Sequence, residues 1–237
     1  MKAMILAAGR GERMRPLTDH TPKPLLPVGG KPLIVWHIER LVQAGITELV
    51  INHAHLGAQI EQTLGDGRAF GAQIRYSPEN PALETAGGIA NARPLLGEDC
   101  FAVVNGDVYC DFDFRQLTAQ AAALRTRGDL AWLALVDNPE HHPQGDFYLA
   151  GDRIETAREN TPKLTFSGIG LYAPSLFDGI PLHTPAPLAP LLRTAIAQGR
   201  VGGLHHRGLW VDVGTPQRLE WLDKSLRASH NAASCSQ

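Results

Sequence analysis

Residues 3–53 read AMILAAGRGERMRPLTDHTPKPLLPVGGKPLIVWHIERLVQAGITELVINH. The short apolar run at 3–8 predicts a buried strand, and a loop rich in glycine, arginine and proline follows it. Pro32 suits the first position of a helix, and Gly45 suits its end. Between them apolar side chains recur at helical spacing, at Ile34, Ile38, Leu41 and Val42. The apolar run at 48–53 then predicts a second strand, which completes a strand, helix, strand unit.

The same alternation continues along the first half of the chain. Helices expected over about 56–64, 88–95 and 114–124 each precede an apolar run, at 72–77, 101–107 and 130–136. Four such units in a row predict an α/β fold with a mainly parallel, doubly wound sheet and right-handed crossovers. Ligands of such sheets bind at the carboxyl ends of the strands.

The second half is less regular, and its pattern predicts mixed β structure with two further helices. A Gly-Asp pair divides GDFYLAGDRI (145–154) into a hairpin, and strands are expected within 164–172 and 201–214. Helices are expected within 186–199 and 215–229, the latter with Thr215 as its N-cap. We expect one domain over residues 1–228 and a disordered tail over 229–237, which lacks periodicity.

Composition limits the classes of partner. The 237 residues carry a formal net charge of −2, so there is no basic field for a nucleic acid. Three cysteines, without a CxxC pair, indicate neither a disulfide framework nor a zinc site. The apolar run at 3–8 is too short for a secretion signal, and there is no run of 18 apolar residues. We therefore expect a cytoplasmic protein with small-molecule partners and no membrane or nucleic-acid role; the sequence leaves its oligomeric state open.

The loop after the first strand has the composition of an anion site. Gly9 and Gly11 leave successive backbone N–H groups free to approach a phosphate. Met14 stands where the third glycine of a dinucleotide fingerprint would be, which disfavours a nicotinamide-dependent oxidoreductase. Three arginines in the same loop, Arg10, Arg13 and Arg15, favour a ligand with several negative charges, such as a nucleoside triphosphate. Solvated loop charges are the alternative interpretation.

Three motifs carry a resemblance to a known family. Lys23 is bracketed by Pro22 and Pro24, so that LAAGRGERMRPLT is followed by TPKPLLPV; NGDVYCD and WVDVGTPQRL occur later in the chain. In this order the motifs resemble those of the sugar-1-phosphate nucleotidyltransferases. Further stretches, including YSPENPALETAGGI and LVDNPEHHPQGDF, resemble the bacterial branch that uses UTP and N-acetylmuramate α-1-phosphate in peptidoglycan recycling. The resemblance covers nearly the whole chain and implies a single Rossmann-like domain with a mixed sheet flanked by helices.

The resemblance also implies roles for particular residues. Arg13 and Lys23 would contact the phosphates, and Asp107 and Asp212 would hold Mg²⁺; these four are the expected catalytic set. Asp107 ends an apolar run and Asp212 lies between two valines, positions where a carboxylate is costly to bury unless it is paired or bound to a metal. The expected nucleotide-binding set adds residues of the first loop and of a predicted helix start: Ala8, Gly9, Gly11, Glu12, Thr85, Gly87 and Gly88.

Sugar recognition is expected from Asn105 and Gly145, although both could be ordinary loop residues. The stretch ETARENTPKLTFSG lacks the Glu-Lys-Pro triplet with which many family members contact the sugar phosphate, since Lys163 precedes leucine. Other substrates of the family, including glucose, mannose or N-acetylglucosamine 1-phosphate with UTP, dTTP or GTP, remain alternatives, as does a noncatalytic module that senses a sugar nucleotide. The pairs His53/His55, His141/His142 and His205/His206 each lack a third ligand, so no histidine metal site is expected.

Overall fold

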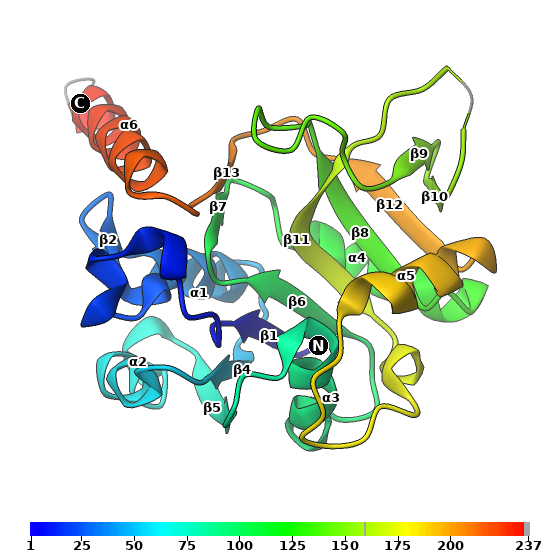
Figure 1. The fold of residues 1–237 in the computed structure, drawn as a ribbon, viewed down its shortest axis with the longest axis horizontal. Helices are drawn as coiled ribbons and strands as arrows, with labels where there is room; N and C mark the ends of the chain where they lie inside the picture. Colours follow the sequence, from blue (N-terminus) through cyan, green and yellow to red (C-terminus); the bar gives the residue numbers. More distant parts are fainter. Residues whose placement is uncertain (159, 235–237) are drawn as a thin grey trace.

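Nine strands form one mixed sheet in the order β5-β4-β1-β6-β11-β8-β12-β10-β9 (Figure 1). The coordinates are a computed structural model that describes residues 1–158 and 160–234. The first four strands in this order are parallel, and they are the strands that the sequence pattern predicts: β1 (Ala3–Leu6), β4 (Glu48–His53), β5 (Gln73–Pro78) and β6 (Phe101–Asn105). Their carboxyl ends therefore lie along one edge of the sheet.

In the second half of the sheet, the order of the strands differs from the order that the sequence pattern predicts. β11 (Thr165–Tyr172) runs antiparallel between β6 and β8 (Ala131–Val136), so the two strands of the fourth unit are not neighbours. β12 (Val201–His205) is parallel to β8, and the predicted hairpin is present as β9 (Tyr148–Ala150) and β10 (Arg153–Glu155). The expected α/β fold with a mixed sheet and flanking helices is confirmed.

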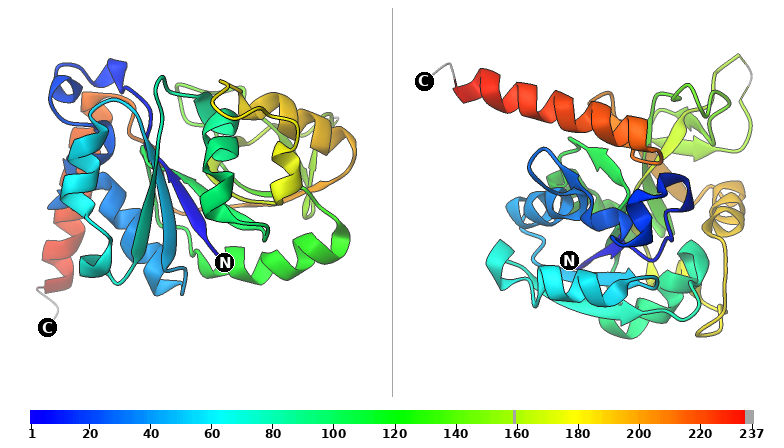
Figure 2. Two further views of the ribbon diagram at one scale, coloured as in Figure 1. Left: turned by 90° about the horizontal axis from the view of Figure 1, so that it is seen from below. Right: turned by 60° about the vertical axis from the view of Figure 1, so that its left-hand side comes forward.

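Alternating side chains of the strands supply two apolar layers, one on each face of the sheet. Ile5 packs in the layer covered by α1 (Leu33–Gln43), α2 (Gly57–Leu64) and α4 (Arg115–Arg127). Its neighbour Met4 points to the opposite layer, covered by α3 (Glu84–Leu96) and α5 (Leu188–Ala197). Figure 2 shows the helices on both faces. The core thus fixes the sheet edge on which the loops between strands and helices meet.

A third apolar cluster holds a smaller sheet beside the main one. β7 (Val108–Cys110) pairs antiparallel with β13 (Trp210–Asp212). Nearby, β2 (Pro27–Val28) and β3 (Lys31–Pro32) form a separate short hairpin. α6 (Pro216–Ser234) covers them through the buried residues Leu219, Leu222 and Leu226. This cluster places the WVD strand directly beside the NGD loop.

The last helix is longer than the sequence predicts. The hydroxyl of Thr215 accepts a hydrogen bond from the backbone N–H of Arg218 at 3.3 Å, as expected of an N-cap. The helix continues to Ser234, and so includes residues 229–234 of the segment for which a disordered tail is expected. Residues 235–237 of that tail lie outside the described residues, and α6 projects from the body at this end (Figure 1). None of the helices in the described residues is long and apolar enough to cross a membrane.

His37 of α1 ties this helix to the strand after the NGD loop. Its side chain is fully buried, and Nε2 lies 2.7 Å from the carbonyl oxygen of Val108. Burial, the largest cause, lowers the pKa of His37 from 6.5 to about 4. The folded protein therefore keeps this imidazole neutral at pH values at which the unfolded chain protonates it.

We predict that His37 contributes to the acid sensitivity of the fold. Its contribution to stability is complete above about pH 6.5, the unfolded pKa, and is lost as the pH falls toward the folded pKa of about 4. Urea unfolding in this window should lose about 1 kcal/mol more per pH unit in the wild type than in His37→Gln. The exposed His20→Gln variant is the matched control and should follow the wild type. Equal slopes in all three proteins would show that His37 is not the group responsible.

Candidate active site

A cavity of about 440 Å³ lies at the carboxyl ends of β1, β4, β5 and β6. Its lining includes most of the residues that the sequence predicts for the site: Ala8, Gly9, Gly11, Glu12, Arg13, Lys23, Thr85, Asn105 and Asp107. These come from four segments far apart in the sequence, and the parallel strands bring them together. Gly87, Gly88, Gly145 and Asp212 are not part of this lining, although Gly214 beside Asp212 is.

The first loop closes one side of the cavity. Gly11 has φ = 65°, and a Cβ at this position would lie 3.0 Å from Thr18 Cγ2 and 3.2 Å from Lys23 Cβ. Glycine therefore allows both the left-handed backbone and the close approach of the two segments. Gly11 O accepts hydrogen bonds from Met14 N and from the Thr18 hydroxyl, each at 2.8 Å. The loop is thus held in one shape by its own contacts.

The three arginines of this loop differ in where they lie. Arg13 is exposed and lines the cavity. Arg15 pairs instead with Asp19 at 3.2 Å, and Arg10 is not part of the lining. The expectation of a polyanion site therefore depends on Arg13 and Lys23 rather than on all three arginines.

Lys23 and Asp107 meet inside the cavity. Lys23 begins the short 3-10 helix Lys23–Leu25, with Pro22 extended before it and Pro24 in its first turn. The Lys23 side chain is 8% exposed, and Nζ lies 2.7 Å from Asp107 Oδ2. A nearly buried ammonium paired with a carboxylate is costly to desolvate, so its place at a cavity indicates a role beyond surface solvation.

Asp212 lies on the strand next to the Asp107 loop. The backbone N–H of Val213 donates to Asp107 O at 3.0 Å, and Asp212 is opposite Val108 in the β7–β13 pair. Asp212 Oδ2 accepts from Arg218 Nη1 at 2.7 Å and lies 3.2 Å from His141 Nε2. The two carboxylates therefore stand on adjacent backbone segments, each held by a cation through Oδ2. Carboxylate oxygens are the ligands that Mg²⁺ takes from proteins, so the donor set fits this ion.

Two buried polar residues, Asn52 and Glu79, line the cavity without having been predicted. Asn52 Oδ1 accepts from Ala7 N at 2.9 Å, and Asn52 Nδ2 donates to Glu79 Oε1 at 2.7 Å. Glu79 Oε2 accepts from Leu83 N at 2.8 Å. This network ties the ends of three parallel strands together beneath the first loop. Their positions at strand ends were the signal that could have identified them.

The start of α3, where Thr85, Gly87 and Gly88 are expected to bind the nucleotide, places its two glycines against other parts of the protein. Gly87 packs against the loop before α5: a Cβ there would lie 2.4 Å from Thr184 O, and its N–H donates to Ala186 O at 3.1 Å. A Cβ on Gly88 would lie 2.5 Å from Glu79 Oε1. Both glycines therefore serve close packing within the protein. Thr85 and the neighbouring Glu84, a non-glycine residue with φ = 58°, line the cavity.

Gly87→Ala is expected to destabilise the protein by about 1–3 kcal/mol, since the new methyl group would clash with backbone atoms that cannot rotate away. Gly9→Ala is the matched control for stability, because a Cβ there meets nothing within 4 Å and its φ is not in the left-handed region. Urea denaturation of both variants measures the difference. If Gly87→Ala were as stable as Gly9→Ala, the loop at Thr184 would have to move aside at little cost in free energy, which would contradict the prediction.

The two expected sugar residues are placed differently. Asn105 ends β6 and lines the cavity, and its side chain packs on Gly168, where a Cβ would lie 2.6 Å from the Asn105 amide. Gly168 lies at the irregularity of β11, with φ = 79°. Gly145 has φ = 58° and packs on Asn138, whose Nδ2 donates to Lys163 O at 2.9 Å. The structure therefore gives Gly145 a role in loop packing and does not bring it to the cavity.

Comparison with known proteins agrees with this geometry. Residues 2–228 match the family model described as nucleotidyl transferase. A Neisseria meningitidis protein named N-acetylmuramate alpha-1-phosphate uridylyltransferase is 60% identical over 223 residues, which are 93% of this chain and 96% of that protein. A Caulobacter vibrioides protein of the same name is 37% identical, over 91% of this chain and 92% of its own.

A solved structure shares the fold over nearly its whole length. A putative glucose-1-phosphate thymidylyltransferase from Bacillus anthracis superposes with a TM-score of 0.82 at 25% identity, covering 96% of this chain and 95% of the other. The family match covers residues 2–228. It agrees with the sequence motifs, with the mixed sheet and with the position of the cavity at the strand ends. The chain belongs to the nucleotidyl transferase family.

Proposed function

We propose that the protein transfers a uridylyl group from UTP to N-acetylmuramate α-1-phosphate, giving UDP-N-acetylmuramate and pyrophosphate, in the recycling of peptidoglycan sugars. The observation that carries the reaction type is the cavity in which the glycine-rich loop, Arg13 and the Lys23–Asp107 pair come together. The choice of sugar and base is supported by the relatives of that name, one of them 60% identical. Because UTP is a cytoplasmic metabolite, we place the reaction in the cytoplasm.

The nucleotide would bind with its phosphates against the first loop. Ala8, Gly9 and Arg13 line the cavity, and nothing lies within 4 Å of a Cβ at Gly9. Backbone N–H groups in such a turn hold phosphate oxygens, and Arg13 would steady the departing pyrophosphate. Glu12 and Thr85 would border the nucleotide, with Gly87 and Gly88 fixing the helix start behind Thr85.

Asp107 and Asp212 would hold the magnesium ion, since they offer oxygen ligands from adjacent segments. When bound, the ion would neutralise phosphate charge and so lower the repulsion between two anions. Lys23 and Arg218 each lie 2.7 Å from one of these carboxylates and fix its orientation. Because two carboxylates are available to hold the ion, we infer that the reaction depends on magnesium.

The chemical step needs positioning more than proton transfer. A sugar 1-phosphate has a second pKa of about 6, so its oxygen is an anion at neutral pH and needs no general base. That oxygen forms a bond to the α-phosphorus of UTP, and the bond from the α-phosphorus to the bridging oxygen of the β-phosphate breaks, so that pyrophosphate leaves with the electron pair. Lys23 and Arg13 offset the charge on the phosphates as they approach. Asn105 would hold a sugar hydroxyl or the N-acetyl group; Gly145 would act through the loop it shapes.

A substrate panel tests the proposal. Initial rates of pyrophosphate release would be measured for UTP, dTTP and GTP, each with N-acetylmuramate, glucose, mannose and N-acetylglucosamine 1-phosphates. We expect the highest kcat/KM for UTP with N-acetylmuramate α-1-phosphate. A higher value for another pair would overturn the substrate while leaving the transferase reaction intact. Binding without turnover of any pair would favour a sensing module.

A further inference from the structure

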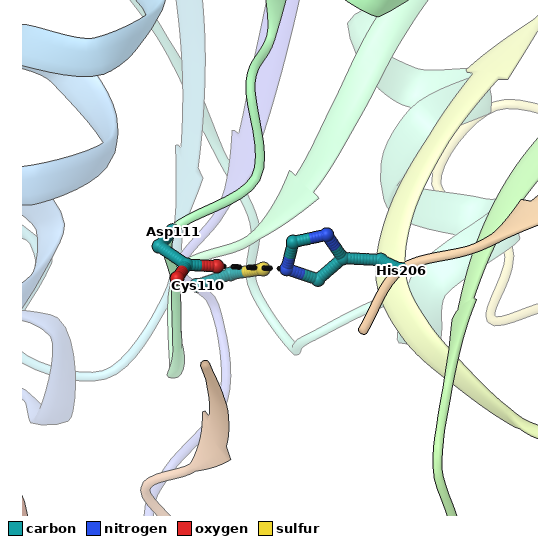
Figure 3. Close-up of side chains that lie close together, drawn as sticks. All are labelled: Cys110, Asp111 and His206. Carbon is teal, nitrogen blue, oxygen red and sulfur yellow. Dashed lines mark hydrogen bonds and ion pairs between the residues drawn. The ribbon is translucent and has the colours of Figure 1, made fainter. Parts of the chain in front are cut away.

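Three side chains that can bind a metal ion meet outside the cavity described above. Cys110 ends β7, Asp111 follows it, and His206 follows β12 directly. One ligand atom from each lies within 4.8 Å of the other two, and Figure 3 shows the three side chains turned toward a common point. Among the side chains that the structure describes, no other three His, Cys, Asp or Glu residues meet in this way. The sequence pattern had left His206 without a third ligand, and the fold supplies two.

The backbone around these side chains is fixed. His206 N donates to Leu135 O at 2.7 Å, and Asp111 N donates to Leu209 O at 3.0 Å. The ring of Phe112 packs edge-on against the His206 imidazole with centroids 5.5 Å apart, which limits rotation of that ring. The three ligand atoms are therefore brought together by the fold rather than by mobile surface chains.

Glycine at 208 keeps the space beside two of these atoms free. A Cβ at Gly208 would lie 2.2 Å from Asp111 Oδ1 and 2.7 Å from His206 Nε2. The two atoms are 2.8 Å apart and form a hydrogen bond, which by itself needs no ion. The Cys110 thiol belongs to the apolar layer on this face of the sheet and also lies within 4.8 Å of both atoms, so it adds a sulfur ligand to the histidine–carboxylate pair.

We propose that Cys110, Asp111 and His206 form a binding site for a zinc-type divalent ion, distinct from the magnesium site of the reaction. Sulfur and imidazole ligands select Zn²⁺ over Mg²⁺, which takes oxygen ligands. Three protein ligands leave one position for water, and Asp111 is exposed enough for an ion to enter. Ligand atoms around tetrahedral zinc stand about 3–4 Å apart, so the ion would replace the His206–Asp111 hydrogen bond.

The proton balance follows from the burial of the thiol. Burial, the largest cause, raises the pKa of Cys110 to about 12, so the sulfur carries its proton when no ion is bound. A bound ion forms a metal–sulfur bond, and the displaced proton passes to solvent. No oxidant or reductant takes part.

Such an ion would link the main sheet to the small sheet, which contains Asp212 in β13 and begins directly after Asp107. Cys110 lies three residues after Asp107 and is opposite Trp210, two residues before Asp212. His206 belongs to the segment that leaves β12. The expected effect is stabilisation of this junction, observed as a rise in melting temperature when Zn²⁺ is added.

Cobalt spectroscopy of the full-length protein tests the site directly. Co²⁺ would be added to the reduced protein in excess Mg²⁺, so that sites made of oxygen ligands are already filled. We expect one equivalent of Co²⁺ to give a thiolate-to-metal charge-transfer band and tetrahedral d–d bands, and Zn²⁺ to abolish both. Cys110→Ser should lose the charge-transfer band, and His206→Gln and Asp111→Asn should weaken binding at least about 10-fold.

Cys100→Ser is the matched control, because Cys100 is also a buried free cysteine but has no place in the cluster. It should bind Co²⁺ as the wild type does. Circular dichroism would establish that each variant is folded. If Cys110→Ser does not fold, the weaker Co²⁺ binding expected of Asp111→Asn still tests the site. Absence of a charge-transfer band in the wild type, or equal bands in wild type and Cys110→Ser, would overturn the proposal.

Discussion

Changing Asp107 to Asn is expected to lower kcat by about 10³-fold, or roughly 4 kcal/mol, while the protein stays folded. The amide keeps the shape of the side chain but removes the charge that faces Lys23 at 2.7 Å and that would hold the metal ion. Asp212→Asn should have a loss of similar size, because Asp212 stands on the adjacent strand and would bind the same ion. Steady-state rates at saturating UTP and sugar phosphate measure both effects.

The double variant Asp107→Asn, Asp212→Asn should be scarcely slower than the slower single variant, since residues that act as a unit have non-additive effects. Raising Mg²⁺ should partly restore either single variant by mass action but should not restore Arg13→Ala, whose expected defect is the loss of a proposed phosphate contact. Asp113→Asn is the matched control: this exposed carboxylate pairs with Arg115 near the same loop and lies outside the cavity. Multiplicative losses in the double variant would mean that the two aspartates do not share an ion.

Replacement of Lys23 by Met should lower kcat/KM for UTP by about 10²–10³-fold. Methionine keeps the buried apolar stem and removes the ammonium that would offset phosphate charge. Lys23→Arg should recover little of this rate, because the Lys23 side chain is 8% exposed and its Nζ lies 2.7 Å from Asp107 Oδ2, so the larger planar guanidinium would not fit in the same place.

Lys31→Met provides the comparison for Lys23. Lys31 also pairs with a carboxylate, that of Glu39, and its Nζ lies over the Trp36 ring, but it is not part of the cavity lining. This variant should keep nearly full activity. If Lys23→Met retained activity close to that of Lys31→Met, the Lys23–Asp107 pair would be structural only.

Short sequence patterns were enough to predict the glycine-rich loop, Asp107 and Lys23 as parts of the site. The glycine loop follows an apolar strand, and Asp107 follows another, so the rule that ligands bind at the carboxyl ends of parallel strands placed both on one edge. The same rule applied to Asn52 would have added the Asn52–Glu79 network. Lys23 was recognisable because two prolines restrict its backbone, and the structure buries it at the cavity.

Other features depend on contacts between distant segments, which no local pattern contains. The insertion of β11 between β6 and β8 depends on how residues 165–172 pair with two strands that lie far from them in the sequence. A pair of adjacent glycines suits either a ligand platform or tight packing, and only the loop at Thr184 shows that Gly87 serves packing. The meeting of Cys110 with His206 likewise joins positions that only the sheet order brings together.

The central claim, nucleotidyl transfer at the α-phosphorus, is tested most directly by following labelled UTP. The enzyme would be incubated with Mg²⁺, N-acetylmuramate α-1-phosphate and UTP labelled at either the α- or the γ-phosphorus, and the products separated. The account predicts that the α-label appears in UDP-N-acetylmuramate and the γ-label in pyrophosphate, in equal amounts. Appearance of the γ-label in a sugar phosphate, or of the α-label in UMP without any UDP-sugar, would contradict it.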